Sequence, residues 1–157
     1  MNKKYQNKLS IINIDEEGRF GGPEKRIVQV ASELKKYNIE TIVIIPNKDS
    51  KIFSDFIKNH DVKFEKLNIT RLSKHWLTLV RYIIRFPLEL TILTLYLKRN
   101  NADIVHLNGC YQFKSVLASI FARKKIIWHL NDTNTYYFLK KIFFLLSYFV
   151  DGFIVSG

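Results

Sequence analysis

The hydrophobic residues of this chain fall into short continuous runs that alternate with longer, amphipathic runs. The short runs are rich in Ile and Val, and such unbroken apolar runs are typical of parallel strands that are covered on both faces. They predict six strands, at residues 9–15, 40–45, 62–66, 102–107, 125–129 and 152–155. The amphipathic runs predict helices at residues 25–37, 50–59, 74–99, 112–122 and 135–150.

This alternating order predicts an α/β fold, in which right-handed helical crossovers build one doubly wound, mainly parallel, Rossmann-like sheet. Ligands of such a sheet bind at the carboxyl ends of its strands. Residues 1–157 suit a single domain, and the 47% of hydrophobic residues can fill one packed core. Because the sequence stops directly after an apolar strand, we expect a domain that is truncated before a second one.

A glycine loop joins the first predicted strand to the first helix. Gly21 and Gly22 place no side chain between the backbone and a ligand, and Pro23 suits the first turn of a helix. The unpaired N–H groups and the helix dipole favour an anion there, most often a phosphate. The other interpretation is a tight turn that uses glycine for its geometry only. The spacing of Gly18, Gly21 and Gly22 does not match G-x-G-x-x-G, which argues against NAD binding.

Polar residues also end two later strands. His106 and Asn108 close the strand at 102–107, and His129 and Asp132 close the next one. In a doubly wound sheet these residues open into the same crevice as the glycine loop, where they can bind hydroxyl groups. Each histidine can instead be a packed core residue, and Asp132 can cap the next helix. The sequence contains no metal-ligand spacing and no nucleophile elbow, so it predicts no metal site and leaves the catalytic residues unidentified.

The formal net charge of +11 points to an anionic partner. The region 71–99 is both basic and apolar, and Pro87 is expected to divide or kink its helix. Four residues before this proline are predicted to face an anionic membrane: Lys74, Trp76, Arg81 and Arg85. The other interpretation is a crossover helix with a solvated basic face. Nucleic acid is disfavoured, because the aromatic residues follow the apolar faces and no nucleic-acid-binding motif is present.

Cysteine content and apolar run lengths indicate where the protein resides. Cys110 is the only cysteine, so no internal disulfide can form. The basic N-terminus is not followed by the apolar segment of a secretory signal, and no apolar run reaches the roughly 18 residues of a membrane span. These features predict a cytoplasmic protein that is soluble or peripherally bound to the inner face of the cell membrane.

Four segments, in the same order along the chain, resemble the N-terminal domain of the family-four retaining glycosyltransferases of the GT-B fold. Residues 21–34 are similar to the Gly-Gly-x-Glu-Arg signature of that family, and residues 102–108 to its Asp-(Ile/Val)-Val-His-x-His motif. Residues 127–132 and 150–156 are similar to its next two strand ends. The resemblance covers nearly the whole chain and implies the N-terminal half of a GT-B fold.

The resemblance implies that this domain binds the acceptor, and that a C-terminal domain, missing from this sequence, holds the nucleotide-sugar donor. Gly21 and Gly22 would approach the donor diphosphate. The acceptor cleft would be lined by Arg19, His106, Asn108, His129 and Asp132. Asn108 stands where the family often has histidine. Retaining transfer of this type needs no protein base, and the nucleotide sugar is a co-substrate, so no cofactor is expected.

The sequence therefore predicts the acceptor-binding half of a glycosyltransferase that moves a sugar from a nucleotide-sugar donor to a glycan or lipid-linked acceptor. Alone, the chain is expected to be inactive. Two other interpretations remain open. One is a non-catalytic membrane-docking or partner subunit of a split glycosyltransferase, and the other is a basic Rossmann-like module that binds a nucleotide or nucleic acid.

Overall fold

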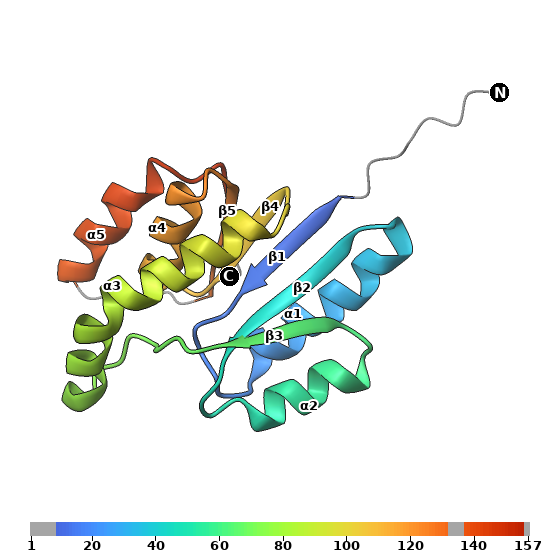
Figure 1. Cartoon of the computed structure of the whole chain (residues 1–157), viewed down its shortest axis with the longest axis horizontal. Coiled ribbons are helices and arrows are strands. Elements are labelled where there is room, and N and C mark those ends of the chain that lie inside the picture. The colour runs from blue at the N-terminus through green and yellow to red at the C-terminus, as the bar shows by residue number, and fades with distance from the viewer. Residues whose placement is uncertain (1–8, 132–136, 156–157) are drawn as a thin grey trace.

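The computed structural model describes residues 9–131 and 137–155, and within them a single sheet runs through the molecule (Figure 1). All its strands are parallel, in the order β3-β2-β1-β4-β5-β6. The strands are β1 (Ser10–Ile14), β2 (Glu40–Pro46), β3 (Lys63–Leu67), β4 (Ile104–Asn108), β5 (Lys125–Leu130) and β6 (Gly152–Val155). The strand order reverses between β1 and β4, which makes this the topological switch point. The predicted doubly wound sheet is confirmed.

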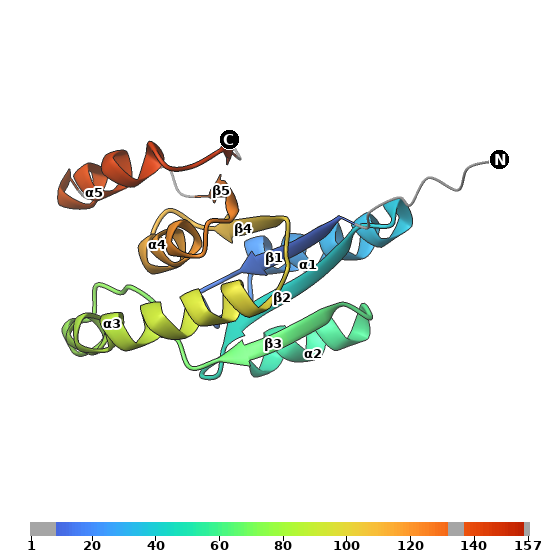
Figure 2. The ribbon, with the colours of Figure 1, turned by 45° about the horizontal axis from the view of Figure 1, so that its top comes forward.

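Helices cover both faces of the sheet (Figure 2). One face carries α1 (Gly22–Leu34), which ends in a 3₁₀ turn, η1 (Lys35–Tyr37), and α2 (Lys51–Asn59). The other face carries α3 (Trp76–Arg99), α4 (Phe113–Phe121) and α5 (Tyr137–Ser147). The helix predicted at 135–150 ends at Ser147 in the structure. Residues 132–136, with the predicted site residue Asp132, lie outside the described residues.

The two faces of the sheet have different chemistry near the switch point. Side chains alternate along a strand, so Ile12 and Ile14 pack under α3, α4 and α5, together with the buried Trp128. Asn13 and its pairing partner His106 therefore face the α1 side. There the apolar core lies between α1, α2, β2 and β3, and polar side chains of β1, β4 and β5 lie beside it.

The long helix α3 contains Pro87 and is a single element of 24 residues. Proline cannot donate the backbone hydrogen bond of a helix, and its ring crowds the carbonyl one turn earlier. The axis of α3 changes direction between its green first turns and its yellow remainder (Figure 1). Of the two outcomes predicted for Pro87, a kinked helix or a divided one, the structure shows the kinked helix.

None of the helices within residues 9–131 and 137–155 combines the length and the apolar character needed to cross a bilayer.

Candidate functional site

A polar pocket of about 490 Å³ lies at the carboxyl ends of β1 and β4. Its walls are the loop after β1 (15–19), the start of α1, the end of β4 with the loop that follows it (108–112), and the segment 71–74 before α3. Asn131, which follows β5, also lines it. The pocket therefore occupies the switch point, where the loops of two adjacent strands diverge and leave a crevice.

Three buried acidic residues, Asp15, Glu16 and Glu24, line this pocket. Asp15 is 2% exposed, and its Oδ1 accepts a hydrogen bond of 2.7 Å from the backbone N–H of Glu17. Burial raises the pKa of Asp15 well above its ordinary value, and the nearby carboxylates of Glu24 and Glu17 act in the same direction. Burial also raises the pKa of Glu24. Both groups keep a proton to a higher pH than surface carboxyls do, which suits hydrogen bonding to hydroxyl groups.

The carboxylate of Glu24 lies over the glycine loop. A Cβ atom on Gly21 would be 3.2 Å from Oε2 of Glu24, whereas one on Gly22 would meet open space. The backbone N–H groups of Glu24 and Gly21 oppose the burial effect and favour the charged form of this carboxyl. Gly21 and Gly22 are exposed, yet the helix start that the sequence predicts to bind phosphate already faces a side-chain carboxylate.

An ion cluster spans the mouth of the pocket. Nε and Nη2 of Arg19 each donate a 2.9 Å hydrogen bond to the carboxylate of Glu17. Nη1 of Arg71, from the segment before α3, donates to the same carboxylate at 2.6 and 2.8 Å. Burial alone would raise the pKa of Glu17, but the two guanidinium groups outweigh it, so the pKa lies below its usual value. Glu17 thus holds the guanidinium groups of Arg19 and Arg71 together at the pocket wall.

The two predicted histidines lie side by side beneath α1. The rings of His106 and His129 stack with centroids 5.6 Å apart, and neither is among the described residues that line the pocket. The side-chain amide of Asn13 donates to Nδ1 of His106 at 3.1 Å. Nη2 of Arg26 donates to Nδ1 of His129 at 3.2 Å and to Oδ1 of Asn131, a pocket residue, at 2.8 Å. His129 is thus linked through Arg26 to the pocket wall, although neither histidine lines the pocket.

This buried layer keeps both rings neutral. Burial, with smaller effects from His129 and Arg26, lowers the pKa of His106 to about 4. Burial and Arg26 also lower the pKa of His129. Since Arg26 donates to Nδ1 of His129, the ring proton of neutral His129 lies on Nε2.

Asn108 connects the buried layer to the pocket wall. Its side-chain amide donates to Oδ1 of Asn13, and its backbone carbonyl accepts from the side chain of Gln112. Gly109, which follows it, has a φ of +100°, a conformation that favours glycine and turns the chain along the pocket. Of the predicted acceptor residues, Arg19 and Asn108 line the pocket.

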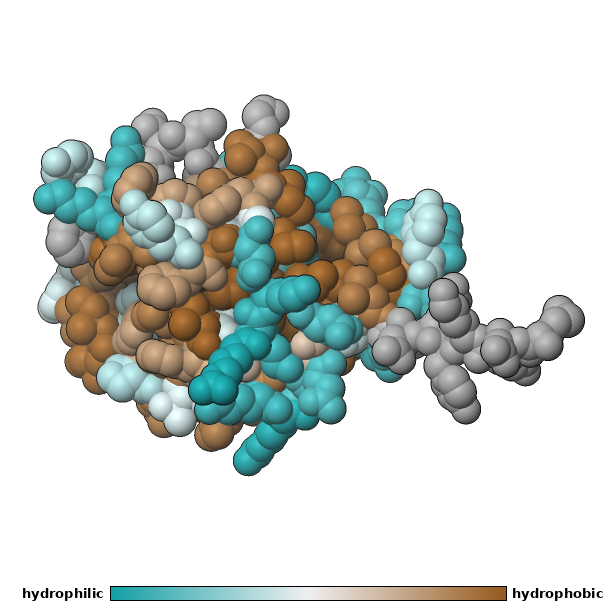
Figure 3. Space-filling view, turned by 90° about the horizontal axis from the view of Figure 1, so that it is seen from above, coloured by the Kyte–Doolittle hydropathy of each residue, from teal (hydrophilic) through white to brown (hydrophobic). Residues whose placement is uncertain are grey.

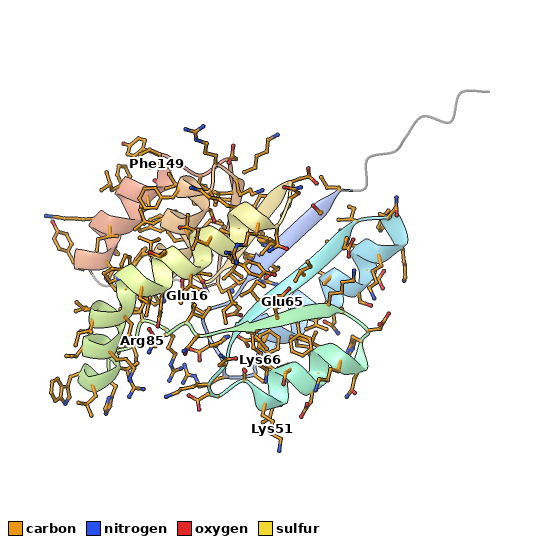
Figure 4. All side chains as sticks on the ribbon, viewed as in Figure 1. Glu16, Lys51, Glu65, Lys66, Arg85 and Phe149 are labelled. Atoms are coloured by element: carbon orange, nitrogen blue, oxygen red, sulfur yellow. The ribbon has the colours of Figure 1, made fainter. Side chains whose placement is uncertain are left out.

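A fully buried lysine organises the region behind the pocket. Nζ of Lys114 donates to Oε2 of Glu89 and to the carbonyl oxygen of Thr70, each at 2.7 Å, and lies 3.3 Å from Oε2 of Glu16. Oε1 of Glu16 accepts from the backbone N–H and the hydroxyl of Ser115. In Figure 4, Glu16 lies at the middle of the molecule, where α3 crosses the sheet. This cluster fixes the loop after β1 and the segment that carries Arg71.

The four residues predicted to face a membrane fall in two environments. Arg85 donates from Nε to Oε1 of the buried Glu89 at 2.7 Å, so it belongs to the ionic cluster. Lys74, Trp76 and Arg81 are exposed, and Lys74 also lines the pocket. α3 also carries the exposed apolar side chains of Leu77, Ile83, Ile84 and Leu88. On or just after α5, the exposed apolar side chains include Phe144, Leu145 and Phe149. Figure 3 shows apolar side chains gathered at the end of the molecule that carries α5.

Several pocket residues were not singled out from the sequence, among them Asp15, Glu24 and Arg71. Asp15 could have been found as the first polar residue after a buried strand, and Glu24 as an acid in the first turn of a helix. Arg71 gave no such signal, because its contact with Glu17 joins positions 54 residues apart. Among the residues that the structure describes, no group of three or more His, Cys, Asp or Glu side chains could hold a metal ion.

No protein-family model and no curated protein sequence matches the chain. Solved structures do match it. MurG from Acinetobacter baumannii aligns with 95% of this chain at a TM-score of 0.68 and 12% identity. A glycosyltransferase from Rickettsia africae aligns with 86% at 0.65 and 21% identity, and a UDP-N-acetylglucosamine 2-epimerase with 94% at 0.61 and 19% identity.

These similarities define a fold. The chain has the architecture of one Rossmann-like half of a GT-B protein, with an all-parallel six-stranded sheet and a pocket at its switch point. It spans 41% of the MurG chain, 33% of the glycosyltransferase and 40% of the epimerase.

Proposed function

We propose that this chain is the acceptor-binding half of a glycosyltransferase that transfers a sugar from a nucleotide-sugar donor to a glycan or lipid-linked acceptor. The observation that carries the proposal is the polar pocket at the switch point of a GT-B half, lined by carboxyl, amide and guanidinium groups. Such groups match the hydroxyl groups of a sugar and the phosphates of a donor.

Each group in the pocket has a role in this proposal. Asp15 and Asn108 bind hydroxyl groups of the acceptor, with Asn131 at the other wall. Arg19 and Arg71 supply positive charge at the pocket mouth. Gly21 and Gly22 approach the donor diphosphate. The main donor contacts come from a second half, either a further domain of the same polypeptide or a partner chain, so this chain alone transfers no sugar.

Retention of the anomeric configuration is the stereochemical part of the proposal. The motif resemblance supports it, and positioning of the reactants with stabilisation of the leaving diphosphate is then the contribution of the protein. The anomeric configuration of the product, read by NMR from the assembled enzyme, tests it. An inverted product would contradict retention.

The acceptor role is tested on the isolated chain by NMR titration with saccharides. We expect amide shifts in residues 15–19 and 108–112, and no sugar transfer or nucleotide release from nucleotide sugars. Sugar transfer by the isolated chain, or shifts confined to another surface, would overturn the assignment. Oligonucleotide binding that weakens steeply with salt, without a response to sugar nucleotides or anionic vesicles, would support a nucleic-acid-binding module instead.

We further propose that the chain is cytoplasmic and binds the inner face of the cell membrane peripherally. The exposed Lys74, Trp76 and Arg81 support this, because they combine positive charge with an interfacial aromatic residue beside exposed apolar side chains of α3. A non-catalytic docking subunit of a split enzyme would use the same surface.

A further inference from the structure

A second pocket, of about 400 Å³, adjoins the polar one and is apolar. Four residues line both pockets: Leu72, Ser73, Lys74 and Tyr111. Leu79 from α3 and Leu139 from α5 complete the apolar part. The two pockets therefore form one continuous depression with a polar end and an apolar end.

The apolar end is built to receive hydrocarbon. Leu79 is 37% exposed there, and the ring of Tyr111 is held edge-on against the buried Phe113, with centroids 6.4 Å apart. When a hydrocarbon chain replaces water against exposed leucine side chains in a concave surface, the buried apolar area makes binding more favourable. Each methylene group that is buried contributes about a fourfold gain in affinity.

Positive charge marks the junction of the two ends. Lys74 lines both pockets, and Arg71 lines the polar one next to it. An anionic group between a hydroxylated head and a hydrocarbon chain would meet Lys74, since lysine binds phosphate as a point charge. It would lie beside Arg71, whose Nη1 is held by Glu17.

We propose that the acceptor is an amphiphile. Its hydroxylated head occupies the polar pocket, its phosphate lies at Lys74, and the first part of its hydrocarbon chain occupies the groove formed by Leu72, Leu79, Tyr111 and Leu139. The identity of the head as a sugar acceptor rests on the proposed function. The adjoining polar pocket and apolar groove are properties of the surface itself. Continuity of the groove with the polar pocket and the charge at the junction favour this occupant over a neutral apolar partner.

Calorimetric titration of the chain with decyl phosphate, kept below its micelle concentration, tests the proposal. We expect decyl phosphate to bind at least tenfold more tightly than inorganic phosphate. Leu79→Ser should weaken it about fivefold or more. The matched control is Leu95→Ser, because Leu95 is also on α3 and 46% exposed but lines neither pocket, and it should leave binding unchanged. Lys74→Gln should weaken decyl phosphate without affecting decyl maltoside.

Equal losses in the Leu79 and Leu95 variants, or equal affinity for decyl phosphate and inorganic phosphate, would overturn the proposal. Binding to anionic vesicles without binding of monomeric decyl phosphate would also overturn it, because the surface would then recognise a bilayer and not one lipid chain. Circular dichroism of each variant checks that the variant is folded before its binding is compared. None of these results depends on sugar transfer, so a chain that binds amphiphile but supports no transfer would refute only the proposed function.

Discussion

A buried cluster of charged residues lies behind the pocket. Glu16, Glu89 and Lys114 are almost completely buried, and each is tied to the others or to the backbone around the pocket. Buried charges persist only when they are paired, since an isolated one loses most of its hydration. The residues behind the pocket therefore matter for its shape even though they are hidden from a ligand.

Replacing Lys114 tests this cluster. Lys114→Met leaves two buried carboxylates without their shared cation, and we expect it to lower the free energy of unfolding by about 3–5 kcal/mol. Urea denaturation measures the loss. Lys51→Met, on the exposed face of α2 (Figure 4), should change stability by less than about 0.5 kcal/mol. Similar losses in both variants would show that the pairing of Lys114 contributes little.

Glu24 should control anion binding at the glycine loop. Its carboxylate lies beside Gly21, and a like charge at short range costs an anion on the order of 1 kcal/mol or more. We therefore expect Glu24→Gln to bind sulfate roughly fivefold more tightly at pH 8, measured by calorimetry. The exposed Glu33→Gln, on the same helix, serves as control.

The pH dependence of this effect follows from the raised pKa of Glu24. Sulfate binding by the wild-type chain should strengthen as pH falls through that pKa, because protonation removes the like charge. The Glu24→Gln variant should lack this increase. An unchanged pH profile in the variant would argue against Glu24 as the competing charge.

His106 should make stability depend on pH. Its pKa is about 4 in the folded chain against an ordinary value of 6.5, so the unfolded chain binds the proton first as pH falls. Stability is then complete above pH 6.5 and falls by up to about 3 kcal/mol as the pH drops to 4. His106→Gln should remove this component, as measured by urea unfolding at several pH values.

The exposed His75 provides the control, since His75→Gln should keep the wild-type pH profile. The raised pKa values of Asp15 and Glu24 act with the opposite sign, because folded carboxyls that take up protons early gain stability as pH falls. Their effect is common to the wild type and both variants, so it cancels in the comparison. A His106→Gln profile that matches the wild type would refute the prediction.

At the scale of single elements, hydrophobic periodicity predicted the kind and order of the helices and strands well. The reason is that a strand covered on both faces, or an amphipathic helix, needs its pattern wherever it lies in the fold. The ends of elements were less certain, and α5 ends at Ser147, three residues before its predicted end. In α3, Pro87 bends the helix without ending it, because contacts on both sides of the proline hold it, including the buried Tyr82 and Leu93.

The first half of α3 should bind anionic vesicles. Ile84 is 73% exposed beside the basic residues of this helix, and Ile52 on α2 is 69% exposed on the other face of the sheet. We expect Ile84→Ser to weaken binding to phosphatidylglycerol vesicles about tenfold or more in co-sedimentation, because a buried isoleucine contributes about 1.5–3 kcal/mol. Ile52→Ser should have no effect. Equal binding by the two variants would place the membrane contact elsewhere.

For the molecule as a whole, the one sheet joins two apolar cores. Trp128 is completely buried in the core under α3, α4 and α5, whereas Phe53 fills the core under α1 and α2. Because both cores pack on the same strands, we expect one cooperative urea transition with coincident midpoints for Trp128 fluorescence and circular dichroism. The Trp76→Phe variant removes the exposed tryptophan, so that Trp128 alone reports. Separate midpoints would mean that the two layers unfold independently.

The amino-acid sequence by itself determined the order of strands and helices, the parallel sheet and the edge of that sheet at which polar residues gather. These features follow from local patterns, since apolar runs, glycines and strand-end polar residues are read over a few positions. Only the tertiary structure decided which of those residues meet. It brought Arg71 to Glu17, set Glu24 over Gly21 and placed His106 and His129 under α1, away from the pocket wall. Such contacts depend on the direction of each side chain and on the element packed against it, and neighbouring residues in the sequence do not encode either.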